Sequence, residues 1–129
     1  MSPIECVWDA SALLALLQRE SGQATATAWL PGAALSSVNW SEVVQKTLAR
    51  QGDIELLRQG IAGLGIRIVP FAQAEAERAA RLWPETQPLG LSLGDRACLA
   101  LALEQGVPVL TADRAWTQLA LDCRIELIR

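Results

Sequence analysis

The stretch VPVLTAD, residues 107–113, places a carboxylate just beyond a short apolar run. Its first four residues have the apolar, partly β-branched composition of a buried strand, and Asp113 follows shortly after that strand. Near the other end of the chain ECVWDAS, residues 5–11, repeats the arrangement, because its apolar residues run directly into Asp9. Two buried strands from opposite ends of the chain are therefore each expected to end at an aspartate.

Strand-like and helix-like segments alternate between these two stretches. Short apolar or β-rich runs predict strands at residues 4–8, 33–38, 66–69 and 107–112, with 123–128 as an edge strand. Helical patterns and their stop signals predict helices at residues 11–20, 25–32, 40–50, 53–62, 72–83, 92–106 and 114–120. The segment PETQPLGLS, residues 84–92, is expected to be a loop. Strands that alternate with helices through short links indicate right-handed βαβ units, so we expect an α/β fold, a three-layer sandwich around a parallel sheet.

The size and composition of the chain suit one ordered domain. Its 129 residues are 51% hydrophobic and 19% charged, and no repeat or linker divides them, so we expect a single domain over residues 1–129. Cys6, Cys98 and Cys123 cannot all pair, and none lies in a C-x-x-C motif, which favours reduced structural thiols in a cytoplasmic protein. The N-terminus lacks a secretory pattern, and the apolar runs are far shorter than the ~20 residues of a membrane span, so no membrane association is expected.

The sequence contains no histidine. This absence excludes a Ser-His-Asp triad, a Cys-His dyad and the usual zinc sites. Any hydrolytic chemistry in this protein would therefore need another way of activating water.

Four acidic residues are expected at one edge of the predicted sheet. In open parallel sheets, ligands bind beyond the carboxyl ends of the strands, where Asp9 and Asp113 would lie. Glu42, in SSVNWSEVV, and Asp95, in LSLGDRACLA, are expected on the first turns of helices that start near the same edge. Carboxylates gathered there would repel one another unless a cation lay between them. Oxygen ligands alone favour a hard cation, Mg²⁺ or Mn²⁺, which would activate water for attack on a phosphate.

Each of these acids also has a purely structural explanation. The segments NWSE, residues 39–42, and SLGD, residues 92–95, resemble capping boxes, in which the acid accepts a hydrogen bond from the N-cap amide. Asp9 and Asp113 are suited to N-caps before their own helices. Taken singly, each acid fits helix capping better than catalysis. Taken together, their convergence at one edge favours a cation site.

Four neighbouring residues are candidates for a supporting role. The hydroxyl groups of Ser11 and Thr111 could orient a carboxylate or a water, or simply bond to the backbone. Arg96 and Arg114 directly follow two of the acids and could pair with phosphate oxygens, or remain solvated near helix starts. The net charge of −3 does not exclude an RNA substrate, because removing the four site acids from it leaves +1.

Four sequence blocks resemble the motifs of PIN-domain ribonucleases. They are VWDASALLALLQRE, SSVNWSEVV, LSLGDRACLALA and VLTADRAW, and they occur in the family's order between Val7 and Trp116. The resemblance covers nearly the whole chain, and four blocks together are more specific than any one of them. A short single-domain form with these blocks is similar to the VapC toxins of bacterial toxin–antitoxin pairs.

The resemblance implies a central parallel sheet of four or five strands and Mg²⁺- or Mn²⁺-dependent endonucleolytic cleavage of RNA. By motif position it places the metal-binding, catalytic acids at Asp9, Glu42, Asp95 and Asp113. It also implies a homodimer and a cognate antitoxin whose tail blocks the site. Some relatives carry a further acid soon after the fourth, where this chain has Trp116, and this departure leaves the number of metal ions open.

Other interpretations of the acids are less consistent with the chain. A phosphatase would need D-x-D after the first strand, where the third residue here is Ser11, and a receiver domain would need a lysine near the last strand, whereas the sole lysine is Lys46. A non-catalytic PIN-fold binding module is disfavoured because all four acids are present. A housekeeping RNA-processing nuclease without an antitoxin shares every residue argument, so this alternative stays open.

Overall fold

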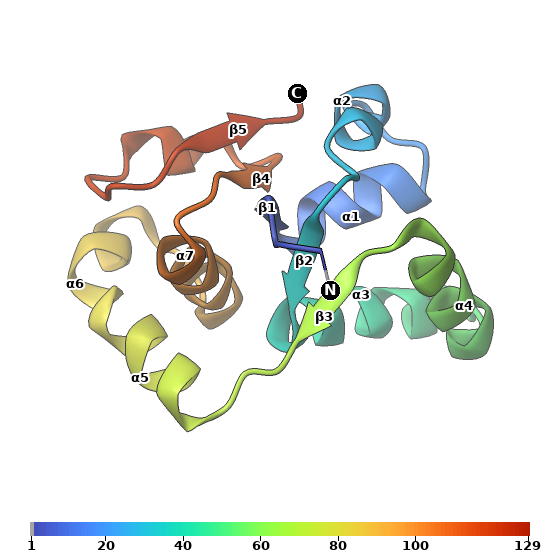
Figure 1. The fold of residues 1–129 in the computed structure, drawn as a ribbon, viewed down its shortest axis with the longest axis horizontal. Coiled ribbons are helices and arrows are strands. Elements are labelled where there is room, and N and C mark those ends of the chain that lie inside the picture. Colours follow the sequence, from blue (N-terminus) through green and yellow to red (C-terminus); the bar gives the residue numbers. More distant parts are fainter. Residues whose placement is uncertain (1) are drawn as a thin grey trace.

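A computed structural model describes residues 2–129, and its centre is one five-stranded sheet (Figure 1). The strands are β1 (Cys6–Trp8), β2 (Ala33–Ser36), β3 (Arg67–Val69), β4 (Val109–Thr111) and β5 (Ile125–Leu127). They lie in the order β3-β2-β1-β4-β5, and every neighbouring pair is parallel. The expected parallel sheet is therefore confirmed, with five strands and with β5 as the expected edge strand.

Helices cover both faces of this sheet and complete the three layers that the sequence predicted (Figure 1). On one side lie α1 (Ala10–Leu17), α2 (Gln23–Ala28), α3 (Ser37–Ala49) and α4 (Ile54–Leu64). On the other side lie α5 (Gln73–Arg81), α6 (Trp83–Thr86) and α7 (Leu93–Gln105). Two short 3₁₀ helices, η1 (Gln87–Leu89) and η2 (Arg114–Gln118), follow α6 and β4.

The two faces of the sheet pack into separate hydrophobic clusters, because side chains alternate along a strand. In β1, Trp8 packs into the cluster that includes α1 and α3, whereas Val7 packs into the cluster that includes α7. Leu110 and Val109 divide in the same way in β4. All four side chains are fully buried, and each stabilises the fold by roughly 1.5–3 kcal/mol. The carboxyl ends of β1 and β4, where two of the acids follow, are therefore held firmly.

The expected boundary between the second strand and the next helix is wrong. The sequence pattern predicted a strand to residue 38 and a helix from residue 40, whereas β2 ends at Ser36 and α3 begins at Ser37. The Oγ of Ser36 accepts a hydrogen bond from the amide of Val38, which caps the helix and turns the chain early. Glu42 consequently lies in the second turn of α3, not in its first.

The segment at residues 84–92 is not the loop that the sequence predicted. Most of it folds into the end of α6 and into η1, each of which has a proline in its first turn. Proline is tolerated there because the amide that it lacks would have no partner within the helix. The hydroxyl of Thr86, fully buried, donates to the carbonyl of Leu82 and ties this segment together. The other expected elements are present, with shifted ends.

All three cysteines are free thiols, as expected. Burial raises the pKa of Cys6 and that of Cys98, so both remain protonated and unreactive at neutral pH. Over residues 2–129, no helix is both long and apolar enough to cross a membrane.

Candidate active site in an acidic pocket

The four acids singled out from the sequence line one open pocket of about 200 Å³. Two of them follow the carboxyl ends of strands β1 and β4, and the other two lie on α3 and α7, at that same edge of the sheet. The residues around this acidic pocket are Asp9, Ala10, Ser11, Leu14, Glu42, Lys46, Asp95 and Asp113. The topology of the sheet therefore brings together carboxylates that are far apart in the chain.

Asp9 is the most deeply buried of the four, with 5% of its surface exposed. Its Oδ1 accepts hydrogen bonds from the Ser11 hydroxyl at 2.7 Å and from the amide of Ala12 at 2.9 Å. Its Oδ2 accepts a hydrogen bond of 2.6 Å from the Thr111 hydroxyl. Asp9 is thus an N-cap of α1, as the structural explanation expected, and it also joins the start of α1 to the end of β4.

The two hydroxyl groups that hold Asp9 are themselves fixed by the backbone. The Ser11 Oγ accepts a hydrogen bond from the amide of Ala112 at 2.9 Å, and the Thr111 Oγ1 accepts one from the amide of Asp113 at 3.0 Å. Each hydroxyl therefore has its proton directed at the carboxylate of Asp9. Both alternatives raised for Ser11 and Thr111 hold, since they bond to the backbone and orient a carboxylate.

Burial makes the negative charge of Asp9 unfavourable. Loss of water contact raises the pKa of Asp9 from 3.8 to about 6, although the hydrogen bonds from Thr111, Ser11 and the Ala12 amide act in the opposite direction. The negative charge of Asp95 raises the pKa of Asp9 further. A carboxylate in this position is stabilised if a cation approaches it.

Glu42 is held from the side by Asn39, which lies one helical turn earlier. The Nδ2 of Asn39 donates to Oε1 of Glu42 and to the carbonyl oxygen of Gly94, both at 2.9 Å. The interpretation of NWSE as a capping box is wrong, because the N-cap of this helix is Ser36 and Asn39 lies buried inside the helix. The polar side chain of Asn39 faces α7 instead of capping α3.

Asp95 and Asp113 do cap their helices, and each uses a single oxygen for this purpose. The Oδ2 of Asp95 accepts from the amide of Ser92 at 2.8 Å, so the predicted SLGD capping box is present. The Oδ1 of Asp113 accepts from the amide of Ala115 at 3.0 Å. The second carboxylate oxygen of each residue accepts no hydrogen bond within residues 2–129. Capping and ligand binding are therefore compatible in these two residues.

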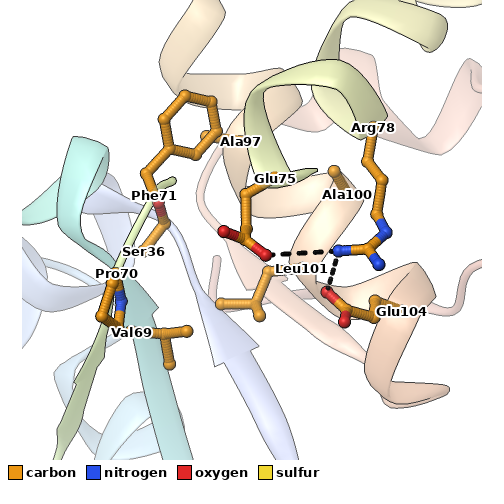
Figure 2. Close-up of a pocket in the computed structure, with 10 residues that line it drawn as sticks. All are labelled: Ser36, Val69, Pro70, Phe71, Glu75, Arg78, Ala97, Ala100, Leu101 and Glu104. Atoms are coloured by element: carbon orange, nitrogen blue, oxygen red, sulfur yellow. Dashed lines mark hydrogen bonds and ion pairs between the residues drawn. The ribbon is translucent and has the colours of Figure 1, made fainter. Parts of the chain in front are cut away.

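The acids of this pocket lack cationic partners, in contrast to another acidic cluster of the same protein. Between β3, α5 and α7, Arg78 bridges Glu75 and Glu104 at 3.3 and 3.1 Å over a small apolar pocket (Figure 2). Within the described part of the chain, none of the four pocket acids lies within 4.0 Å of a lysine or arginine nitrogen. No ion pair within the described residues neutralises the negative charge of these acids, which favours the approach of a cation to the pocket.

The donors of the acidic pocket suit a divalent metal ion. They are carboxylate oxygens without histidine or thiolate, which is the set that Mg²⁺ and Mn²⁺ prefer. However, no three His, Cys, Asp or Glu side chains among residues 2–129 lie close enough together in this structure to hold an ion. The pocket thus fits a metal ion in the chemistry of its donors, and binding would require side chains to move.

The two candidate arginines do not line the acidic pocket, whereas a lysine that was not among the candidates does. Arg96 and Arg114 do not line the acidic pocket, so their expected pairing with phosphate there has no geometric support. Lys46 does line it, and its spacing of four residues from Glu42 on a helix is the sequence signal that would have found it. Trp116, at the position where some relatives carry a further acid, is fully buried in the core.

Comparison with solved structures places this fold among the components of toxin–antitoxin complexes. Over 97% of this chain and 98% of the other, it is similar to a toxin–antitoxin complex from Klebsiella pneumoniae, with 23% identity and a TM-score of 0.73. It is also similar to DNA-bound VapBC from Salmonella typhimurium (14% identity, TM-score 0.68, 98% and 99% covered). A third similar structure is FitAcB from Neisseria gonorrhoeae (21% identity, TM-score 0.67, 95% and 97% covered). A comparison with curated proteins gives no match.

A parallel five-stranded sheet with carboxylates gathered beyond its strand ends defines an α/β protein suited to a cation-dependent site. The PIN domain family model matches residues 6–121, which include all four acids. The chain belongs to the PIN domain family, whose members are generally nucleases that use divalent metal ions.

Proposed function

We propose that this protein is a metal-dependent endoribonuclease that hydrolyses RNA phosphodiester bonds, and that it is the toxin of a type II toxin–antitoxin pair. The observation that carries the proposal is the group of four carboxylates that line one pocket and make no ion pair with a lysine or arginine among residues 2–129. The proposed ligands of Mg²⁺ or Mn²⁺ are Asp9, Glu42, Asp95 and Asp113. When bound, the ion would lower the pKa of a water molecule and neutralise charge on the phosphoryl oxygens.

The residues of the chain have distinct tasks in this mechanism. Ser11 and Thr111 hold the carboxylate of Asp9 in one orientation through their fixed hydroxyl groups. The caps at Asp95 and Asp113 fix one oxygen of each and leave the other without a hydrogen bond from residues 2–129, so that it can bind a ligand. Lys46 offers an ammonium group at the same pocket and binds a phosphate of the RNA. None of these steps requires a histidine base.

The proposed partners are an RNA substrate, a second copy of the chain and a cognate antitoxin. Support for the antitoxin comes from the similar structures, which are a toxin–antitoxin complex and VapBC and FitAcB structures. A housekeeping RNA-processing nuclease would share the acidic pocket. Expression of the chain in bacteria separates the two functions, because a toxin arrests growth and co-expression of its neighbouring gene restores it. Normal growth on expression of an active nuclease would favour the housekeeping role.

The activity itself is tested with the protein purified away from any partner. We expect total RNA to be cut at discrete positions in the presence of Mg²⁺ or Mn²⁺ and to remain intact with EDTA. Mapping the new ends identifies the cleavage sequence. RNA that stays intact with either ion would contradict the proposed nuclease, and cutting that persists in EDTA would contradict its dependence on metal.

We expect Lys46→Gln to weaken RNA binding more than it slows the chemical step. Loss of one charged contact to phosphate should raise KM about tenfold, equivalent to about 1.4 kcal/mol, with kcat nearly unchanged. Steady-state cleavage of a short RNA measures both constants. Arg50→Gln is the control, because Arg50 ends the same helix and does not line the pocket. Equal effects of the two substitutions would indicate a general charge effect rather than a contact at the site.

A further inference from the structure

The side chain of Asn39 joins two of the elements that carry the proposed metal ligands. It is 1% exposed, and its Nδ2 donates one hydrogen bond to Glu42, three residues later in α3, and one to the carbonyl of Gly94 at the start of α7. Its Oδ1 is buried and has no hydrogen-bond partner within residues 2–129. Burying an unpaired amide oxygen is unfavourable. Asparagine is therefore expected here only if the two hydrogen bonds that its Nδ2 donates have a role that an apolar residue could not fill.

Gly94 lies against the carboxylate of Glu42. A Cβ atom at this position would lie 2.5 Å from Oε1, 2.8 Å from Cδ and 2.9 Å from Oε2 of Glu42. The backbone of Gly94 is helical and has no positive φ, so its conformation does not require glycine. Alanine is the better helix former at such a position. The space taken by the Glu42 carboxylate is therefore the reason for glycine here.

We propose that Asn39 and Gly94 are positioning residues that set where the carboxylate of Glu42 lies relative to Asp95. Asn39 draws Glu42 toward the first turn of α7, and Gly94 leaves the room in which the carboxylate sits. Because Asp95 is the next residue after Gly94, one contact fixes the spacing between two proposed ligands from different helices. This inference rests on the proposed function, in which Glu42 binds the metal ion.

The binding of Mn²⁺ to the purified protein tests this inference without any nuclease assay. Gly94→Ala adds a methyl group that displaces the end of a flexible side chain, so the variant should fold with an unchanged or higher melting temperature. Residues that orient metal ligands typically change metal affinity by roughly 10–100-fold, and we expect the Kd for Mn²⁺ to rise by that factor. Calorimetry or electron paramagnetic resonance measures the Kd.

A matched control removes the effect of helix propensity. Gly60 lies inside α4, and a Cβ there would meet nothing within 4 Å, so Gly60→Ala adds the same methyl group in open space. We expect this variant to bind Mn²⁺ like the parent. Asn39→Leu, which is similar in size and neutral but has no donor, should weaken Mn²⁺ binding as Gly94→Ala does. A Kd for Gly94→Ala equal to that of the parent would overturn the inference.

A double-mutant cycle with Glu42→Ala shows whether the effect passes through Glu42. Once that carboxylate is removed, Gly94→Ala should have no further effect on the Kd, because the group that it displaces is absent. In EDTA the same cycle, followed by melting temperature, should show that Gly94→Ala is better tolerated without the Glu42 carboxylate. Independent effects in both cycles would overturn the positioning role. A parent protein that binds no Mn²⁺ would instead contradict the proposed function, and the cycle in EDTA would still decide whether Gly94 and Glu42 are in contact.

Discussion

Asp9→Asn is expected to reduce Mg²⁺-dependent RNA cleavage by roughly 10³-fold while the fold remains intact. The substitution removes the negative charge of the most buried acid in the pocket and keeps an oxygen that can accept from the Ala12 amide, so the cap of α1 persists. Single-turnover cleavage with excess enzyme separates this loss from any change in RNA binding. Circular dichroism and thermal unfolding show whether the variant is folded.

The control for Asp9→Asn is the same substitution at another N-cap. Asp53 is exposed, caps α4 by accepting from the amides of Glu55 and Leu56, and does not line the acidic pocket. Because asparagine caps helices about as well as aspartate, Asp53→Asn should cleave RNA at the rate of the parent. If Asp9→Asn also cleaved RNA at that rate, Asp9 would serve only as the N-cap of α1 and would have no role in catalysis.

Stability gives a second measure of the same substitution. The pKa of Asp9 is raised to about 6 in the folded protein, from 3.8, so the folded state binds the proton more tightly than the unfolded state. The stability contributed by protonated Asp9 is therefore present at low pH and is lost as pH rises toward 6. In metal-free protein above pH 6, Asp9→Asn should be more stable than the parent by at most about 3 kcal/mol, and the difference should shrink below pH 5. Urea unfolding in EDTA at pH 5 and pH 7 measures it.

The arrangement of the sheet could be predicted because it depends on patterns that are local in the chain. Apolar runs such as those at residues 107–110 and 5–8 mark buried strands, and their alternation with helices leaves few parallel topologies. Once the strands are parallel, residues that follow their carboxyl ends must share an edge. The convergence of Asp9 and Asp113 therefore followed from the sequence with no knowledge of side-chain contacts.

The details of the site depend on contacts between helices, which the sequence does not reveal. The spacing of Asn39 and Glu42 is the same in a capping box and in the middle of a helix, and only the position of Ser36 as N-cap distinguishes the two. The role of Gly94 appears only when α3 lies against α7. The side-chain positions of Arg96 and Arg114 could not be inferred from their being next to acids, because neighbours on a helix point in different directions.

Asp95→Asn is expected to separate the capping of α7 from its proposed part in metal binding. The substitution keeps an oxygen that can accept from the amide of Ser92, so the helix should retain most of its cap. It removes the charge that the other carboxylate oxygen offers to the pocket, and we expect cleavage to fall by roughly 10²- to 10³-fold, or 3–4 kcal/mol. The rate at saturating Mg²⁺, the Kd for Mn²⁺ and the free energy of unfolding are measured together.

Ser92→Ala is the complementary substitution, because it damages the cap and leaves the charge. The Ser92 Oγ accepts from the amide of Asp95 at 3.2 Å, and loss of this bond should cost about 1 kcal/mol of stability. Asp95 would keep its carboxylate in the pocket, so Ser92→Ala should cleave RNA within a few-fold of the parent. If Asp95 binds the ion, Ser92→Ala should therefore be the less stable variant and Asp95→Asn the less active one. If Asp95 serves only as a cap, Asp95→Asn will cleave RNA as well as Ser92→Ala does, and the acidic pocket will need another explanation.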